Sequence, residues 1–298
     1  MAGIPAHLRS RIAKAAGGFS LVELIVVIVI TGIIASVVGL FITGPIQGFL
    51  DTSRRAELVD GAQLALTRMG RDLRSALPNS VRISGNALEL LATTDGDRYR
   101  VETSGADTAA DRLQFNAADD SFNTLGALGS DEPAPTADYD FTGALAIYPL
   151  QQAGANPYNA ADGVMTPFGD IEVEPVTNGT AAEYRISLTS GSPAPGAHRF
   201  PFDSPSRRVY AVSGPVTYYC NPPQLLRYSG YAVTAVQAVP PAGTPTVIAG
   251  NVRACVFGYD PGTAQRNGVV SIALSLADDA ALEERVRLIR QIHVNNAP

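Results

Sequence analysis

An apolar segment near the N-terminus is the feature that most constrains this chain. Between Phe19 and Ile42 the only charged residue is Glu23. As an α-helix at about 1.5 Å per residue, this segment is roughly 36 Å long, enough to cross a hydrocarbon core of about 30 Å. The sequence therefore predicts a transmembrane helix over residues 19–44.

Glu23 is the residue in this segment that calls for a functional explanation. An ionised side chain inside lipid costs roughly 2.5 to 3.5 kcal/mol on insertion scales, so we expect a partner for it. If the chain is cut after Gly18, the new α-amino group of Phe19 is a cation within reach of Glu23 in a neighbouring copy. The two charges would then neutralise each other away from water.

Two simpler interpretations of the segment exist. An ordinary secretory signal has a short apolar region followed by small residues at the cleavage site. Here the apolar region is longer, and Gly17 and Gly18 come before it. A plain single-pass anchor is the second interpretation, and it stays open on physical grounds because Glu23 lies close enough to the helix end to reach the interface.

The sequence Gly-Phe-Ser-Leu-Val-Glu at 18–23, followed by an apolar run, resembles the class III signal of type IV prepilins and of type II secretion pseudopilins. The resemblance implies that residues 1–18 are a leader cleaved by a prepilin peptidase. Gly18 would precede the cut, and Phe19 would become an N-methylated N-terminus. Glu23 would align the subunit with other pilins during assembly from an inner-membrane platform.

The flanking charges and the cysteines agree on an orientation. Arg9, Arg11 and Lys14 precede the apolar segment, so the positive-inside rule places the N-terminus in the cytoplasm and the rest of the chain in the periplasm. Cys220 and Cys255 fit that oxidising compartment as one disulfide, with two free buried thiols as the alternative.

The chain after the apolar segment predicts a helix followed by strands. An amphipathic helix is expected over 45–77, kinked or locally melted at Pro45 and ended by Pro78. Its apolar positions recur at steps of three and four: Leu58, Ala62, Ala65, Leu66, Met69, Leu73, Ala76 and Leu77. Residues 78–298 are then expected to form a β-rich head. The fold class is α+β, a pilin-like long helix packed on an antiparallel sheet.

The alternation of apolar and polar residues, together with turn-forming residues, predicts where the strands of the head lie. Early strands are predicted over 80–84, 87–92 and 98–102, the last two separated by a turn at Asp95-Gly96-Asp97. Residues 103–200 are interpreted as an irregular insertion, with apolar pieces at 112–115, 145–150, 171–176 and 184–188. A C-terminal sheet is predicted over 208–294, from strands at 208–220, 224–229, 252–259, 269–276 and 286–294.

A narrower resemblance extends over most of the chain. Five segments resemble minor pilins of the mannose-sensitive haemagglutinin (MSHA) pilus, of the MshO type: 71–83, 210–220, 225–231, 254–263 and 291–298. This implies a minor subunit that primes or enters a pilus used in surface attachment. The sheet is also similar to the larger minor pseudopilins of type II secretion, which is the alternative assignment.

Residues that often carry chemistry are scattered. His7, His198 and His293 lack a nucleophile at motif spacing. Two pairs of carboxylates, Asp95 with Asp97 and Asp138 with Asp140, are candidate calcium ligands but lack a twelve-residue loop spacing. The formal net charge of −6 argues against non-specific nucleic-acid binding.

We therefore predict a structural protein without catalytic activity, cofactor or metal. An enzyme or ligand-binding domain on a simple membrane anchor is the competing class. That class predicts a chain that keeps its leader and tolerates Glu23→Ala.

Overall fold

The structure is a computed structural model that describes residues 18–102, 112–178, 181–262, 266–278 and 285–296. The chain divides into two compact units, Met1–Arg54 and Arg55–Pro298. The predicted leader, 1–18, lies outside the described residues except for Gly18.

Helix α1, Leu21–Arg74, is the only α-helix in the described part of the chain. Its first portion is the apolar segment, whose side chains are almost all exposed within the N-terminal unit. The helix continues through Pro45 without a break in the described backbone, so local melting, one of the two predicted effects of Pro45, was wrong, while a kink there stays a prediction. Proline removes one backbone donor, and the hydrogen bonds of the adjacent turns are enough to keep the helix intact.

The portion of α1 inside the second unit packs one stripe into the core, as the sequence predicted. Its buried residues are Leu58, Ala62, Ala65, Leu66, Met69 and Leu73. The helix ends at Arg74 rather than at residue 77. The reason is that the chain here turns to pair with a strand: the Leu77 amide donates to the Leu91 carbonyl, and the Ser75 carbonyl accepts from the Thr93 amide.

Nine strands form an antiparallel sheet in which β1-β2-β7-β4-β5-β6-β3 are neighbours, while β8 pairs with β7 and β9. Their bounds are β1 Arg82–Ser84, β2 Ala87–Arg98, β3 Ser121–Thr124, β4 Tyr139–Ala146, β5 Gly169–Asn178, β6 Ala181–Ser187, β7 Arg208–Asn221, β8 Gln224–Ser229 and β9 Thr246–Ala249. A short 3-10 helix, η2, covers Ala160–Asp162.

The Asp95-Gly96-Asp97 turn was predicted wrongly, because β2 runs through it while pairing with β7. The register shifts of this pairing lie between Ala92 and Asp95, before the predicted turn, whose three residues pair in register with β7. Gly96 faces Tyr210, and a Cβ at this position would lie 2.9 Å from the tyrosine ring. Glycine is therefore used for a close cross-strand approach and not for a turn.

The segment 103–200 is more regular than predicted. Within it, β4, β5 and β6 pair in sequence and extend the large sheet, and β3 pairs with β6. The predicted pieces 171–176 and 184–188 fall largely in β5 and β6. The pieces 112–115 and 145–150 lie mostly outside the strands, since only Leu145 and Ala146 of the latter belong to β4.

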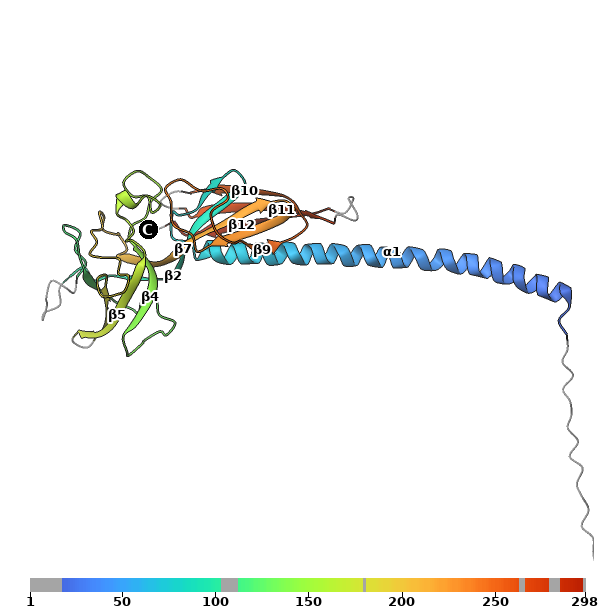
Figure 1. The fold of residues 1–298 in the computed structure, drawn as a ribbon, viewed down its shortest axis with the longest axis horizontal. Coiled ribbons are helices and arrows are strands. Elements are labelled where there is room, and N and C mark those ends of the chain that lie inside the picture. Colours follow the sequence, from blue (N-terminus) through green and yellow to red (C-terminus); the bar gives the residue numbers. More distant parts are fainter. Residues whose placement is uncertain (1–17, 103–111, 179–180, 263–265, 279–284, 297–298) are drawn as a thin grey trace, which may run out of the picture. The chain divides into compact units, whose positions relative to one another are not determined.

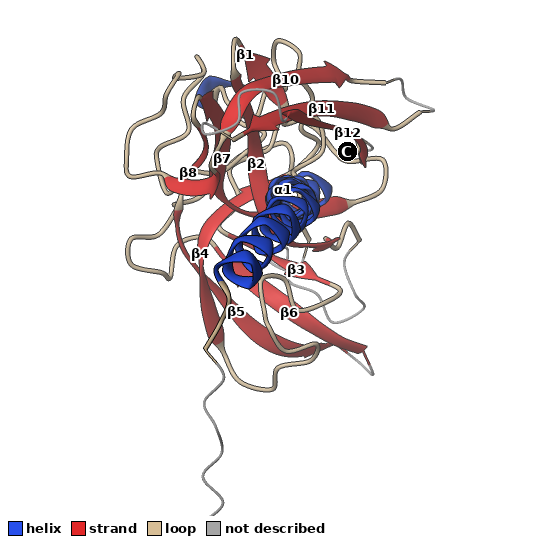
Figure 2. Cartoon of the chain, turned by 90° about the vertical axis from the view of Figure 1, so that its right-hand side faces the viewer, coloured by secondary structure: helices blue, strands red, loops and turns tan. Residues whose placement is uncertain are grey.

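A second sheet contains three antiparallel strands, β10 Val252–Asp260, β11 Gly268–Ala277 and β12 Arg285–Val294. The prediction of one C-terminal sheet over 208–294 was therefore wrong, because β7 and β8 belong to the large sheet. The three-stranded sheet and the β5–β6 end of the large sheet lie at opposite ends of the β-rich unit (Figures 1 and 2).

Among the described residues, the core of the second unit consists of three clusters. The largest lies between α1, the three-stranded sheet and one end of the large sheet, and another fills the β3–β6 end. A small third cluster contains Leu77, Leu91, Tyr158 and their neighbours. Strand β7 contributes to all three: Tyr218 to the first, Ala211 to the second and Val212 to the third.

A polar contact fixes α1 on the large sheet. Asp72 accepts hydrogen bonds from the Tyr218 hydroxyl at 2.7 Å and from Nε of Arg227 at 2.8 Å. Burial raises the pKa of Tyr218, and the bond to the Asp72 carboxylate raises it further because both favour the neutral phenol.

We expect the protein to lose stability as the pH rises above about 10, the pKa of tyrosine in an unfolded chain. Desolvation raises the folded-state pKa of six tyrosines: Tyr99, Tyr139, Tyr158, Tyr218, Tyr231 and Tyr259. The folded state therefore holds protons that the unfolded state releases, and stability falls with increasing pH in this range. Thermal unfolding of the full chain followed by circular dichroism between pH 8 and about 11 measures the effect. A melting temperature that does not change above pH 10 would contradict it.

Candidate functional site

The N-terminus of α1 carries the residues predicted to direct processing and assembly. Gly18 and Phe19 precede the helix, and Phe19 is 79% exposed. A Cβ added to Gly18 would meet no atom within 4 Å. The peptide bond between these two residues is therefore uncovered in the described structure.

Ser20 caps the helix, a role that the sequence analysis missed. Its Oγ accepts a hydrogen bond from the Glu23 amide at 3.2 Å, and its carbonyl accepts from the Leu24 amide at 3.1 Å. The signal was present in the sequence, because Ser-x-x-Glu before an apolar run is the pattern of a capping box. The cap places Glu23 in the first turn, where the partial positive charge of the helix end favours a carboxylate.

The Glu23 carboxylate is exposed, and no cation lies within ion-pair distance of it among the described residues. The residues three and four positions further on, Val26 and Val27, are exposed apolar side chains on the same face of the helix. A carboxylate on an otherwise apolar helix surface is costly to keep away from water unless a cation pairs with it.

The helix that carries Glu23 is long enough to span a membrane. Among the described residues one candidate span is found, Leu21–Gly39, with 19 residues and none of them buried. At about 1.5 Å per residue it covers roughly 28 Å, close to the thickness of a hydrocarbon core.

The disulfide predicted between the two cysteines is present in the structure. Cys220, near the end of β7, and Cys255, in β10, form a disulfide with a Cα–Cα distance of 6.0 Å. Because β7 and β10 belong to different sheets, the bond connects the large sheet to the three-stranded sheet.

The histidines do not converge on a reactive site in the described residues. His198 Nε2 lies 2.8 Å from the Gly163 carbonyl, and its ring packs edge-on against Phe200. His293 is exposed on β12, and His7 lies outside the described residues.

The candidate calcium ligands do not form a metal-binding group among the described residues. Asp95 accepts hydrogen bonds from the amides of Gly96 and Gly129, while Asp97 accepts from the amide of Arg98. Asp138 immediately precedes β4 and Asp140 lies in it. No group of three or more metal-ligating residues is found in the part of the chain that the structure describes.

Comparison with known protein families matches residues 13–39 to the prokaryotic N-terminal methylation motif. The matched region includes Gly18, Phe19, Glu23 and the whole of the candidate span. No curated protein and no solved structure matches the chain. The chain therefore carries the class III signal of type IV pilin-like proteins. This signal and the apolar helix indicate anchoring in a membrane.

Proposed function

We propose that this protein is a minor type IV pilin of the MSHA type, a structural subunit without catalytic activity. The observation that carries the proposal is the methylation motif over 13–39, with Glu23 exposed on the apolar helix and without an ion-pair partner among the described residues. The long helix packed on antiparallel sheets is the architecture that this role requires.

Processing would convert the precursor to the assembling form. A prepilin peptidase on the cytoplasmic side cuts after Gly18 and methylates the new N-terminus at Phe19. The uncovered peptide between these residues supports this step, because a peptidase needs access to the bond. The basic residues of the leader support the orientation, with the N-terminus cytoplasmic and the β-rich unit periplasmic.

Assembly would follow from the charge on the helix. In the inner membrane, keeping the charged Glu23 carboxylate in lipid costs free energy. In a bundle of like helices, the carboxylate pairs with the N-terminal amine of a neighbouring major or minor pilin. The assembly platform of the inner membrane extracts the subunit from lipid, and the mature protein reaches the pilus at the cell surface. No nucleic acid is part of this function.

The five segments that resemble MshO-type subunits support the MSHA system, and the large β-rich unit supports a minor, priming or tip position. A pseudopilin of a type II secretion system is the alternative within the same class. The neighbouring genes would separate the two, since each system is encoded with its own assembly proteins.

The test is the intact mass and N-terminal sequence of the protein from membranes of cells with and without the prepilin peptidase. We expect a chain that starts at N-methylated Phe19 only when the peptidase is present. Gly18→Val should keep the leader in both strains. The absence of contacts at Gly18 means that this change does not disturb packing in the described structure.

Gly17→Ala is the matched control, because it changes the preceding glycine and leaves Gly18 in place. It should be processed as the wild type is. A wild-type chain that keeps residues 1–18 with the peptidase present, or that is cut after the apolar segment, would contradict the proposed function and favour a simple membrane anchor.

A further inference from the structure

The pairing of β7 has a gap on one edge. On one side, β7 pairs with β2 along its length. On the other side, β4 pairs with it only as far as Val212, and β8 pairs with it only from Val216 onward. Neither strand reaches Ser213, Gly214 and Pro215, so this short stretch is left without a neighbouring strand on that side.

A pocket of about 720 Å³ lies at this gap. One wall is Ser213–Pro215 of β7, another is the segment 230–233 that follows β8, and a third is Met165–Phe168. Tyr158, next to η2, and His198 complete part of the lining. The pocket lies over the small third core cluster, between the two larger ones, and junctions of this kind are common positions for ligand sites.

The lining is aromatic and apolar. It includes three aromatic rings, Tyr158, Phe168 and Tyr231, and the thioether of Met165, and it contains no Asp, Glu, Lys or Arg. Gly214 and Gly230 also line the pocket, and a Cβ at either position would meet no atom within 4 Å. Such a surface binds an uncharged ring well, because aromatic pairs and sulfur–aromatic contacts add to the burial of apolar area.

Three hydroxyl groups of the lining, those of Tyr158, Tyr231 and Thr166, make hydrogen bonds within the protein. The Tyr158 hydroxyl donates to the Ser80 carbonyl at 2.7 Å, and the Tyr231 hydroxyl donates to Glu89 Oε1 at 2.9 Å. The Thr166 hydroxyl oxygen accepts from the Leu145 amide at 2.9 Å. Since their hydrogen bonds are made inside the protein, these groups offer few partners to a sugar or another polar ligand.

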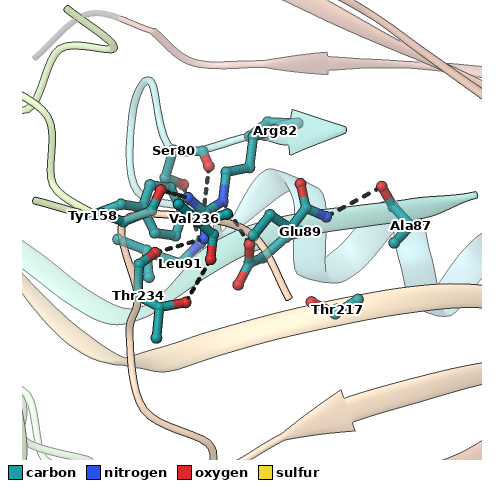
Figure 3. A network of polar contacts seen from close by, with 12 residues as sticks. Ser80, Arg82, Ala87, Glu89, Leu91, Tyr158, Thr217, Thr234 and Val236 are labelled. Atoms are coloured by element: carbon teal, nitrogen blue, oxygen red, sulfur yellow. Dashed lines mark hydrogen bonds and ion pairs between the residues drawn. The ribbon is translucent and has the colours of Figure 1, made fainter. Parts of the chain in front are cut away.

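Arg82 holds the wall formed by the segment after β8. Its Nε pairs with Glu89 Oε2 at 2.5 Å, and its terminal nitrogens donate to the carbonyls of Thr234 and Ala235 at 2.9 and 2.7 Å. The guanidinium also lies 3.5 Å from the centre of the Tyr158 ring. Figure 3 shows this network linking β1 and β2 to the segment that carries Thr234 and Val236. The pocket is therefore preformed, which lowers the entropy cost of binding.

We propose that this pocket binds a small, uncharged aromatic compound. An added peptide strand does not fit the gap, because three residues of β7 span only about 10 Å and β4 and β8 close both ends. The described lining has no carboxylate, lysine or arginine, which disfavours a charged ligand, and its histidine, His198, is already engaged through Nε2 with the Gly163 carbonyl. The internally bonded hydroxyls disfavour a polar ligand.

The test uses the three methionines of the chain as NMR probes. The full chain in lipid nanodiscs is labelled with ¹³C at the methionine methyl groups and titrated with indole. Met165 lines the pocket, whereas Met69 is fully buried in the largest core cluster. We expect a saturable shift of the Met165 resonance and no shift of Met69. A shift of both together, or one that never saturates, would show general partitioning and overturn the proposal.

Chemical class is tested with two further probes of similar size. Benzoate carries a charge, and cyclohexanol is an uncharged ring without aromatic character. Both should bind more weakly than indole. Equal binding of benzoate would overturn the requirement for an uncharged ligand, and equal binding of cyclohexanol would overturn the aromatic class.

Phe168 and Phe202 provide matched variants, since they are 40% and 42% exposed and only Phe168 lines the pocket. Phe168→Ala should weaken indole binding about tenfold, the effect of losing one aromatic contact and its buried area. Phe202→Ala should leave binding unchanged. Equal weakening by both variants would place the binding elsewhere and refute the assignment.

Discussion

Replacing Glu23 with glutamine should reduce incorporation of the subunit into filaments by at least about tenfold while leaving its amount in the membrane unchanged. The physical reason is that glutamine has nearly the size of glutamate but lacks the charge that pairs with a neighbouring N-terminal amine. Loss of even 1.4 kcal/mol from each such contact corresponds to a tenfold change in equilibrium. The measurement is the ratio of subunit in sheared filaments to subunit in membranes.

Glu57→Gln is the matched control for this experiment. Glu57 is an exposed carboxylate on the same helix, beyond the candidate membrane span. The Glu57→Gln variant should assemble normally. The Glu23→Asp variant should retain part of the wild-type incorporation into filaments because it keeps the negative charge. If Glu23→Gln is incorporated as well as the wild type, the pairing of Glu23 with a neighbouring N-terminal amine is refuted. The competing interpretation, in which Glu23 only reaches the membrane interface, would then be favoured.

Removal of the disulfide should have the largest effect on the stability of the β-rich unit. Cys220 and Cys255 are separated by 35 positions, and on the chain-entropy model closing such a loop stabilises the folded state by about 4 kcal/mol. That is a large fraction of the 5 to 15 kcal/mol typical of a folded domain. Cys220→Ala combined with Cys255→Ala should lower the melting temperature by about 10 °C.

Reduction of the wild-type protein gives an independent measurement of the same quantity. Dithiothreitol should lower the melting temperature of the wild type to about that of the double variant and should leave the double variant unchanged. If reduction has no effect on the wild type, although mass spectrometry shows two free thiols, the two sheets are held together mainly by packing.

The parts of the structure that could be predicted were those with a strong period in the sequence. The apolar segment and the stripe containing Leu66 and Met69 specify a helix and its buried face, because neither a strand nor a loop satisfies a repeat of three and four. Strands β7, β8, β10, β11 and β12 were found because alternation continues over several residues between clear turn residues.

The division into two sheets could not be predicted, because alternation identifies a strand and not its neighbour. Strand β9 and strand β3 have four residues each, too few to establish a period. The Asp95-Gly96-Asp97 sequence misled for a local reason: these residues pair in register with β7, and Gly96 allows the close approach to Tyr210. The pocket was not predicted because its lining comes from segments far apart in the sequence.

Strand β7 has a consequence for how the β-rich unit unfolds. Two sheets and three core clusters would ordinarily allow separate parts to open independently, at different free energies. Here one strand supplies Tyr218, Val212 and Ala211 to the three clusters. Withdrawing β7 exposes all of them at once, so we expect the three clusters to open together rather than independently.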